Sequence, residues 1–266
     1  MPFLPLLRSC VDPATVLLRA GRFLKARDYD VEVALQFFRD DFIWREARQL
    51  NEIVQTGGGA VPKLFAEFRV PELQELKAVR MITFHKTDRL GQPIAYDRPT
   101  HATIREMHKV TSLERLMEYA VWFQEATVVY RLPAASLAAG RLVTQITVII
   151  DVSGFALKNF NAEMRAVLKA LTSISANHYP ETMQRTFIVN APLAFRVVWR
   201  FLKIILPPKV VEAIRICGGP HDYLPVLERD VCNRSQIPTF LGGDDASFVD
   251  FAHEIGPWAE HLPKLV

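Results

Sequence analysis

Cysteine, net charge and long apolar runs are all scarce in this chain of 266 residues, and each scarcity excludes a class of protein. The three cysteines, Cys10, Cys217 and Cys232, lie far apart and form no C-x-x-C pair. This pattern argues against a disulfide framework or a cysteine zinc site and favours a reducing compartment. The formal net charge of +3, with no basic block, is too small to indicate nucleic-acid binding.

No apolar run approaches the roughly 20 residues that a membrane-spanning helix needs. The first residues also lack the basic start and the length of a signal peptide. Half of the residues are nonetheless hydrophobic, which is ample for a sizeable core. We therefore expect a folded cytoplasmic protein that touches membranes only peripherally.

Motifs that would indicate catalysis are also missing. The chain contains no G-x-S-x-G elbow, no phosphate-binding glycine loop, no dinucleotide fingerprint and no H-E-x-x-H metal motif. Ser153, in the segment Asp151-Val-Ser-Gly154, is a weak nucleophile candidate that is more simply explained as part of a strand exit. We predict that the protein is not an enzyme and needs neither a metal nor a cofactor.

What the sequence does contain is an unusually apolar helical segment, Pro192 to Leu206. Its only charges are Arg196, Arg200 and Lys203, and spacings of four and three residues place them on one helical face. Two interpretations fit this pattern: an interfacial helix that meets lipid, or a core helix whose cations form its solvated edge. The apolar remainder of the segment comprises Phe195, Val198, Trp199, Phe201, Leu202 and Ile205.

The order of the predicted elements indicates a helical front followed by an α/β body. Helical periodicity covers about 12–54, and shorter helical pieces extend to about residue 80. Short strands around the turn at 88–91 come next, and a long helix runs from about Thr111 to a stop near Pro133. Leu142 to Ile150 is nearly continuously apolar, as in a strand of a parallel sheet, and helices and strands then alternate. We place domains at 1–79 and 80–244, with a tail at 245–266.

Six short motifs follow one another along the chain: Arg22 to Asp30, Asp88 to Tyr96, Ile149 to Gly154, Tyr179 to Met183, Asn190 to Pro192 and Ile237 to Gly243. In this order they resemble the motifs of the CRAL-TRIO lipid-transfer family, and the match covers nearly the whole chain. The resemblance implies an α/β fold in which a mostly parallel sheet, flanked by helices, encloses an apolar lipid cavity. A small N-terminal helical bundle precedes this body, and the helix at about Leu193 to Leu206, here called the gate helix, closes the cavity.

The resemblance also implies candidate site residues. Glu181 occupies the position of the headgroup glutamate of phosphoinositide-binding relatives, and Arg27 and Arg215 are its candidate basic partners. The cations Arg196, Arg200 and Lys203 are expected to contact membranes. Candidates for lining the lipid-tail region and the gate are Phe195, Val198, Trp199, Leu202, Ile205, Ile146 and Val148.

The family's headgroup signals are incomplete in this chain, so the lipid stays open between a phosphoinositide and a sterol-like, isoprenoid or other weakly polar molecule. Asp28 and Ala213 stand where phosphoinositide-binding relatives have lysines. Ile146 and Val148 stand where a choline-binding relative has a Ser/Thr pair. We predict a monomer that binds one lipid and transfers it between membranes; the alternative is a lipid-regulated signalling or adaptor module without transfer activity.

Overall fold

The computed structural model describes residues 13–48, 50, 75, 81–99, 104–251 and 253–259. The chain divides into two compact units. One comprises Met1–Val70, Ile174–Thr182 and Pro263–Val266, and the other comprises Pro71–Ser173 and Met183–Leu262. The helical pieces predicted between 54 and 80 lie outside the described residues, and the domain boundaries at 79 and 244 stay a prediction.

The first unit contains the helices α2 (Pro13–Ala26) and α3 (Val31–Ala47). They are separated by a turn in which Asp28 and Tyr29 take left-handed backbone angles. Asp30 starts α3 because its carboxylate accepts a hydrogen bond from the Val33 N–H at 3.1 Å. The helices pack through aromatic rings, with Phe23 and Phe38 edge to face at 5.5 Å.

A buried carboxylate ties the segment 174–182 to these helices. Asp41 is fully buried in α3 and accepts hydrogen bonds from Arg19 of α2 and from His178. The ring of His178 also stacks on Trp44 at 3.7 Å. Because a buried carboxylate is stable only when its oxygens are paired, these contacts fix the end of the helix that carries His178.

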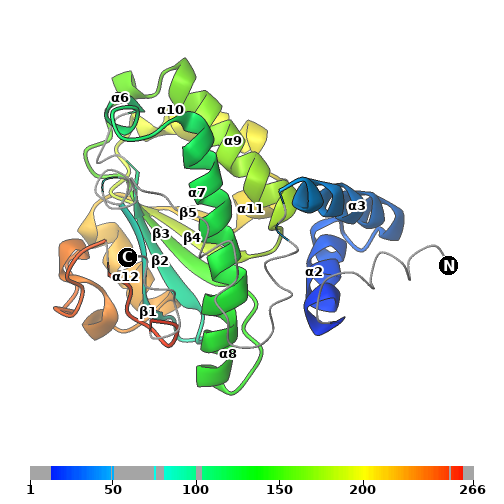
Figure 1. Ribbon diagram of the computed structural model, residues 1–266. Coiled ribbons are helices and arrows are strands. Elements are labelled where there is room, and N and C mark those ends of the chain that lie inside the picture. The colour runs from blue at the N-terminus through cyan, green and yellow to red at the C-terminus, as the bar shows by residue number, and fades with distance from the viewer. Residues whose placement is uncertain are drawn as a thin grey trace. The chain divides into compact units, whose positions relative to one another are not determined.

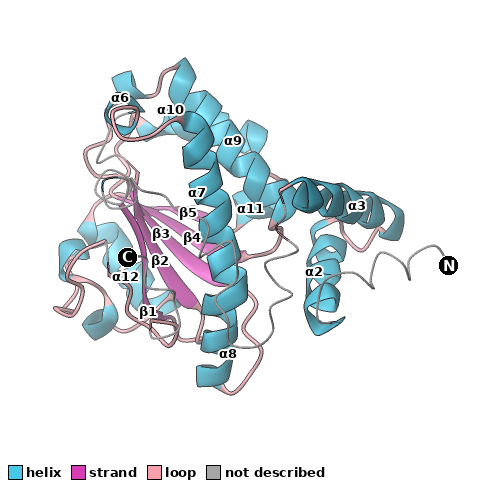
Figure 2. Ribbon diagram, in the orientation of Figure 1, coloured by secondary structure: helices cyan, strands magenta, loops and turns pink. Residues whose placement is uncertain are grey.

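The second unit is built on a five-stranded sheet (Figure 2) of the strands β1 (Met81–Thr87), β2 (Pro93–Arg98), β3 (Ile146–Asp151), β4 (Met183–Val189) and β5 (Ile214–Ile216). Strands β2 to β5 run parallel, and β1 pairs antiparallel with β2. This confirms the predicted α/β class with a mostly parallel sheet. The β1–β2 turn is closed by Asp88, whose carboxylate accepts from the backbone of Leu90 and Gln92 and from Thr147.

Helices cover both faces of the sheet, and side-chain alternation along the strands decides which residues meet which helices (Figure 1). Tyr96, Ile149 and Phe187 pack against α12 (Pro220–Asp230) on one face. Ala95 and Val148 point to the other face, toward α8 (Leu132–Ala139). The remaining helices are α6 (Ile104–Met107), α7 (Leu113–Ala126), α9 (Ala162–His178), α10 (Phe195–Ile205) and α11 (Pro208–Glu212), with 3-10 turns at Leu157–Asn159, Arg234–Gln236 and Thr239–Leu241.

Two predicted boundaries were wrong. The helix expected to stop near Pro133 continues through Ala139, because the π-helical turn Thr127–Arg131 restarts the hydrogen bonding and leaves Pro133 in the first turn of α8. The strand expected from Leu142 begins only at Ile146. Leu142 is exposed, so the apolar run from Leu142 to Ile150 does not mark one continuous buried strand.

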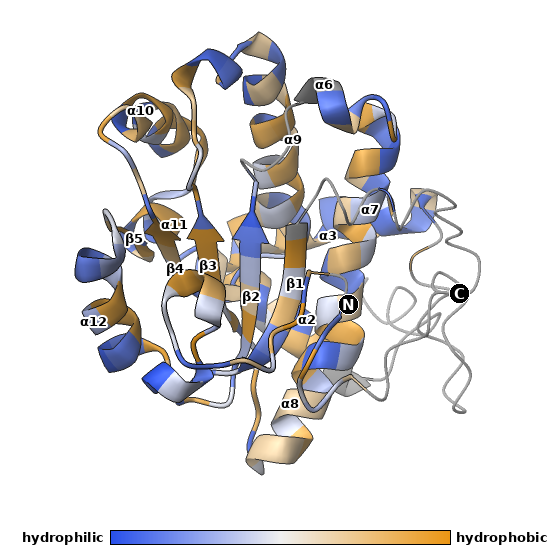
Figure 3. Ribbon diagram, turned by 90° about the vertical axis from the view of Figure 1, so that its left-hand side faces the viewer, coloured by the Kyte–Doolittle hydropathy of each residue, from blue (hydrophilic) through white to orange (hydrophobic). Residues whose placement is uncertain are grey.

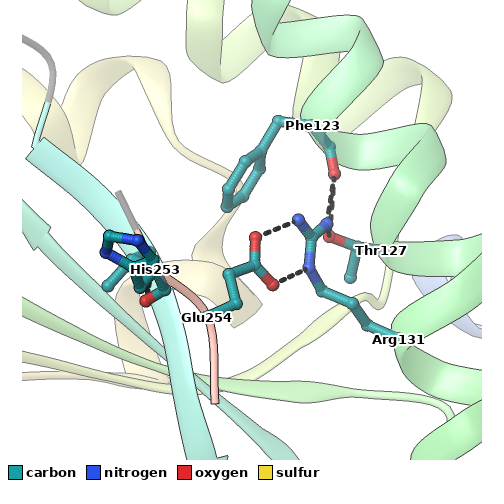
Figure 4. Close-up of polar contacts among 6 residues, drawn as sticks. Phe123, Thr127, Arg131, His253 and Glu254 are labelled. Carbon is teal, nitrogen blue, oxygen red and sulfur yellow. Dashed lines mark hydrogen bonds and ion pairs between the residues drawn. The ribbon is translucent and has the colours of Figure 1, made fainter. Parts of the chain in front are cut away.

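The π-helical turn places a buried arginine beside the C-terminal segment (Figure 4). The fully buried Arg131 makes a bidentate ion pair with Glu254, at 2.9 Å from Nε and 2.6 Å from Nη2. Its guanidinium also donates to the Phe123 carbonyl and to the Thr127 hydroxyl, and it lies 4.4 Å from the centre of the Phe84 ring. These contacts fasten the segment around Glu254 to the sheet and to the end of α7.

Candidate functional site

An apolar cavity of about 260 Å³ lies within the second unit, on the face of the sheet opposite α12. Ile150 of β3 and Ile188 of β4 form its floor, and residues of α9 and α10 form its walls. Asp97 and Asn159 are the two polar residues among those that line it. A cavity with so little polar surface suits a hydrocarbon chain and disfavours a strongly hydrated ligand.

The two walls follow from helical periodicity. On α9, Met164, Val167, Leu168 and Leu171 recur at spacings of three, one and three residues and therefore share one face. The wall formed by α10 likewise consists of residues on one helical face, spaced three and four positions apart: Phe195, Val198 and Leu202. Phe195 and Val198 are buried, and Phe195 meets Phe155 edge to face at 5.7 Å.

Hydrophilic and hydrophobic residues both occur along α10 (Figure 3), and its outer face combines cations with exposed apolar side chains. Arg196, Arg200 and Lys203 are all exposed, as the spacing predicts. Leu193 just before the helix is 78 % exposed, and Ile204 within it is 81 % exposed. An apolar side chain left in water beside three cations is typical of a helix that docks on an anionic interface.

The structure places some of the predicted tail and gate residues at the cavity and others elsewhere. Phe195, Val198 and Leu202 line the cavity, whereas Trp199 and Ile205 do not. Trp199 packs beside the Val198 cluster, with the Lys203 ammonium 5.4 Å from its ring centre. Ile146 and Val148 share the cavity's face of the sheet but pack under α8 with Phe84 and Trp258, so they do not line the cavity.

The headgroup candidates of the first unit are not paired as predicted. Glu181 takes a left-handed φ of 57°, which is uncommon for a residue with a side chain, and its carboxylate pairs with Lys25 at 2.7 Å. Arg27 instead lies over the Phe37 ring at 3.7 Å, and partial burial lowers the pKa of its guanidinium. Lys25 is therefore the basic residue that the structure brings to Glu181.

Arg215 lies in β5 of the second unit. It stands in register with Phe187, and its guanidinium pairs with Asp230 of α12 at 3.4 Å. Phe187 packs on the α12 face of the sheet, so Arg215 faces away from the apolar cavity. Its partner here is Asp230 rather than a group in the cavity.

The comparisons with known proteins agree with this geometry. The sequence profile of the CRAL/TRIO domain matches residues 78–243. The SEC14 cytosolic factor of Candida glabrata is 32 % identical over 254 residues, which cover 94 % of this chain and 78 % of that protein. The chain belongs to the CRAL/TRIO family.

Other CRAL/TRIO relatives are longer proteins. The phosphatidylinositol/phosphatidylcholine transfer protein SFH11 of Arabidopsis thaliana is 34 % identical over 241 residues, or 89 % of this chain and 60 % of its own length. For the transfer protein SFH12 of the same plant, the matched part is 38 % of the relative. The chain thus spans between about two fifths and three fifths of these two proteins.

The CRAL/TRIO fold itself is shared with a solved structure. The crystal structure of Sfh5 superposes with a TM-score of 0.65 over 91 % of this chain and 78 % of that one, at 14 % identity. Across the described ranges, no helix is both long enough and apolar enough to cross a bilayer. The same ranges contain no group of three or more His, Cys, Asp or Glu side chains placed to hold a metal ion.

Several residues at the CRAL/TRIO cavity were missed from the sequence. The wall formed by α9 had a visible signal, because its four apolar residues follow helical spacing. The sequence carried no signal for Asp97, because a charged residue near the end of a short strand is usually solvated, whereas Asp97 is buried. Lys25, which lies in the first unit and not at the cavity, was also missed, because the family resemblance points to the position of Asp28 for a headgroup lysine in the motif Arg22 to Asp30.

Proposed function

We propose that the protein binds a single lipid, holds its apolar part in the cavity between the sheet, α9 and α10, and transfers or presents it between membranes. One observation carries this proposal: α10 supplies a wall of the apolar cavity with Phe195, Val198 and Leu202 while its outer face exposes Leu193, Ile204 and three cations. One helix thus meets both the cavity and the surroundings, as a gate helix must.

The energetics of lipid exchange explain why such a helix is useful. Moving a lipid into water exposes roughly 30 methylene groups at about 0.8 kcal/mol each, whereas the cavity and the bilayer are similarly apolar. The net cost of exchange is therefore small, and the barrier lies in exposing the lipid during the move. A helix that docks on the interface and opens there lowers this barrier.

We also propose which residues recognise the lipid headgroup. Glu181, with Lys25 as its observed partner, is the candidate for recognising a phosphoinositide headgroup. Asp28 and Ala213, in place of the family lysines, and Ile146 and Val148, in place of the Ser/Thr pair, favour a weakly polar lipid instead. The names of the relatives SFH11 and SFH12, which mention phosphatidylinositol and phosphatidylcholine, favour the phospholipid.

A transfer assay between donor and acceptor vesicles tests the proposal. We expect the purified protein to accelerate transfer of a fluorescent phospholipid, as a monomer that associates only transiently with the vesicles. Lipid binding without transfer would support the alternative, a lipid-regulated signalling or adaptor module. Esterase activity lost on Ser153→Ala would contradict the proposal that the protein is not an enzyme.

The site of action is proposed on the same grounds. The relative in Candida glabrata is named a cytosolic factor, and we propose that this protein likewise works in the cytoplasm and visits membranes peripherally. Fractionation of cells that express a tagged chain would test this, with most of the protein expected in the soluble fraction.

A further inference from the structure

A second hollow, of about 480 Å³, lies on the opposite face of the sheet from the apolar cavity, and its character is polar. Neighbouring residues of β2 separate the two, because Asp97 lines the cavity while Arg98 lines the second hollow. We call this hollow the strand-end crevice. Its polar lining is Arg98, Asp151, Ser153, Asn190 and Tyr223, with Gly219 and Pro220 at the start of α12.

The crevice stands at the carboxyl ends of β2, β3 and β4. Arg98 and Asp151 are the last residues of their strands, and Asn190 directly follows β4. In open sheets with parallel strands, ligands bind in the crevice outside these strand ends. No residue that lines the apolar cavity lines this crevice, so the lipid site leaves it unexplained.

The carboxylate in the crevice is already satisfied by protein groups. Asp151 accepts from the backbone and hydroxyl of Ser153 at 2.9 and 3.0 Å and from the Asn190 amide at 2.8 Å, and it pairs with Arg98 Nε at 3.0 Å. Four donors thus offset its charge. It therefore acts as a support that orients Arg98 rather than as a site for a cation.

The guanidinium of Arg98 has more hydrogen-bond donors than its contacts with Asp151 and Ser153 use. Its Nε pairs with Asp151 and its Nη2 donates to the Ser153 hydroxyl at 3.3 Å, while Nη1 takes part in neither contact. The side chain is 28 % exposed, so solvent or a ligand can reach it. A guanidinium oriented through one edge and open at another is well suited to hold an oxyanion.

The start of α12 adds a second attraction for negative charge. The helix has 11 residues, and Gly219 at its N-cap provides no side chain to satisfy the first N–H groups. Asp222, the acidic residue of the first turn, is exposed; its carboxylate lies beside Gly218 and does not line the crevice. Arg98 and the start of α12, at Gly219 and Pro220, therefore face the same crevice.

We propose that the strand-end crevice binds a small phosphate-type oxyanion. The guanidinium of Arg98 and the start of α12 hold the anion, and the amide of Asn190 and the hydroxyl of Tyr223 line the space beside it. The crevice is larger than a bare phosphate, so it accommodates a small phosphorylated molecule or a lipid headgroup with the same chemistry.

Binding in the crevice would reach the helix that closes the apolar cavity. Asn190 has a left-handed φ of 57° and is followed by Ala191 and Pro192, which line the crevice and lead into α10. An anion that contacts Asn190 therefore stabilises one conformation of this connection. This consequence rests on the proposed function of α10, whereas the binding site itself does not.

The test is calorimetric titration of the purified protein with inorganic phosphate, with chloride keeping the ionic strength constant. We expect saturable binding. Gly219→Asp should weaken it at least about tenfold, because an aspartate N-cap places its own carboxylate at the helix start. A Cβ at Gly219 meets no atom within 4 Å and its φ is −75°, so the variant is accommodated.

Gly219→Asn is the matched control, because it also caps the helix but carries no charge. It should retain phosphate binding, while Arg98→Gln should lose it with Asp151 still hydrogen-bonded. Equal binding by the wild type, Gly219→Asp and Arg98→Gln, or no binding by the wild type, would overturn the proposal.

Vesicles distinguish the source of the anion. Preferential binding to phosphatidic acid vesicles over neutral vesicles, lost in Gly219→Asp but kept in Gly219→Asn, assigns the crevice to a lipid headgroup. Phosphate binding without this preference assigns it to a free ligand.

Phosphate should also change the rate of lipid transfer by the wild type but not by Gly219→Asp, and an equal effect on both would overturn the link to α10. Absence of transfer in every variant, with phosphate binding intact, contradicts the proposed function and not the crevice.

Discussion

At the scale of single residues, the cavity is most directly probed at Val198. This side chain is buried and lines the cavity, whereas its neighbour Val197 is partly exposed. Val198→Phe adds a ring to a space of about 260 Å³ and should reduce the amount of bound lipid severalfold while the fold is kept. Val197→Phe is the matched control and should bind lipid as the wild type does. Equal lipid content in the two variants would contradict the assignment of the cavity.

Glu181 and Lys25 offer a test of headgroup recognition. Their ion pair is partly exposed, so Glu181→Gln should change the free energy of unfolding by less than about 1 kcal/mol. If the pair recognises a phosphoinositide, the same change lowers capture of phosphatidylinositol roughly tenfold, the loss expected when a charged hydrogen bond is removed. Capture measured from mixed vesicles checks this. Undiminished capture would remove Glu181 from the headgroup site.

Asp245 makes a pH-dependent contribution to stability. Burial by itself would raise the pKa of Asp245, but hydrogen bonds from Lys86, Ser247 and His85 outweigh burial and hold its pKa well below the usual range. The stabilisation is therefore complete above the unfolded-state pKa of about 3.9 and is lost as the pH falls toward the folded-state value. Asp245→Asn should be less stable than the wild type at pH 7, and the difference should shrink in acid. Chemical unfolding at several pH values measures this, and a difference that grows in acid would contradict it.

At the scale of elements, the outer face of α10 carries the electrostatic part of membrane docking. Arg200→Glu with Lys203→Glu should slow transfer to anionic vesicles severalfold and leave transfer to neutral vesicles nearly unchanged, because these exposed charges attract an anionic surface. Arg165→Glu with Lys169→Glu, which changes two charges on α9, is the control. Vesicle binding by the wild type that does not change across a salt titration would contradict this role.

The π-helical turn and the C-terminal segment are joined by the pair of Arg131 and Glu254. Glu254→Gln leaves the fully buried Arg131 without a charged partner and should lower the free energy of unfolding by about 3 kcal/mol. Glu228→Gln, which weakens an ion pair between half-exposed groups, should cost less than about 1 kcal/mol. Urea unfolding of both variants measures the contrast. Equal costs would show that Arg131 finds another partner.

Elements with strong periodicity could be predicted from the sequence, and those set by tertiary contacts could not. The segment Pro192 to Leu206 could be predicted to contain a helix, now seen as α10, because the spacing of its residues separates an apolar face from a cationic face. The extension past Pro133 was missed because a π-helical turn has no sequence pattern of its own. Ile146 and Val148 were assigned to the cavity, but strand alternation fixes only the face of the sheet and not which helix covers each position.

At the scale of the whole molecule, the second unit carries an apolar and a polar hollow on the two faces of one sheet. The apolar cavity lies under α9 and α10, and the polar strand-end crevice lies on the face that α12 covers. The segment 190–192 connects them, because it leaves the crevice and enters α10. The proposed lipid site on one face and the proposed anion site on the other are thus joined through one short connection.

We propose that the apolar cavity holds one lipid. Mass spectrometry of lipids extracted from the purified protein, after incubation with a total lipid extract, measures this occupancy. We expect about one lipid per protein for the wild type and Val197→Phe, and severalfold less for Val198→Phe. Recovery of phosphatidylinositol would assign the headgroup role to Glu181, and recovery of a weakly polar lipid would assign the change of specificity to Asp28, Ala213, Ile146 and Val148. A lipid content no higher than that of a control protein without such a cavity would contradict lipid binding in the cavity.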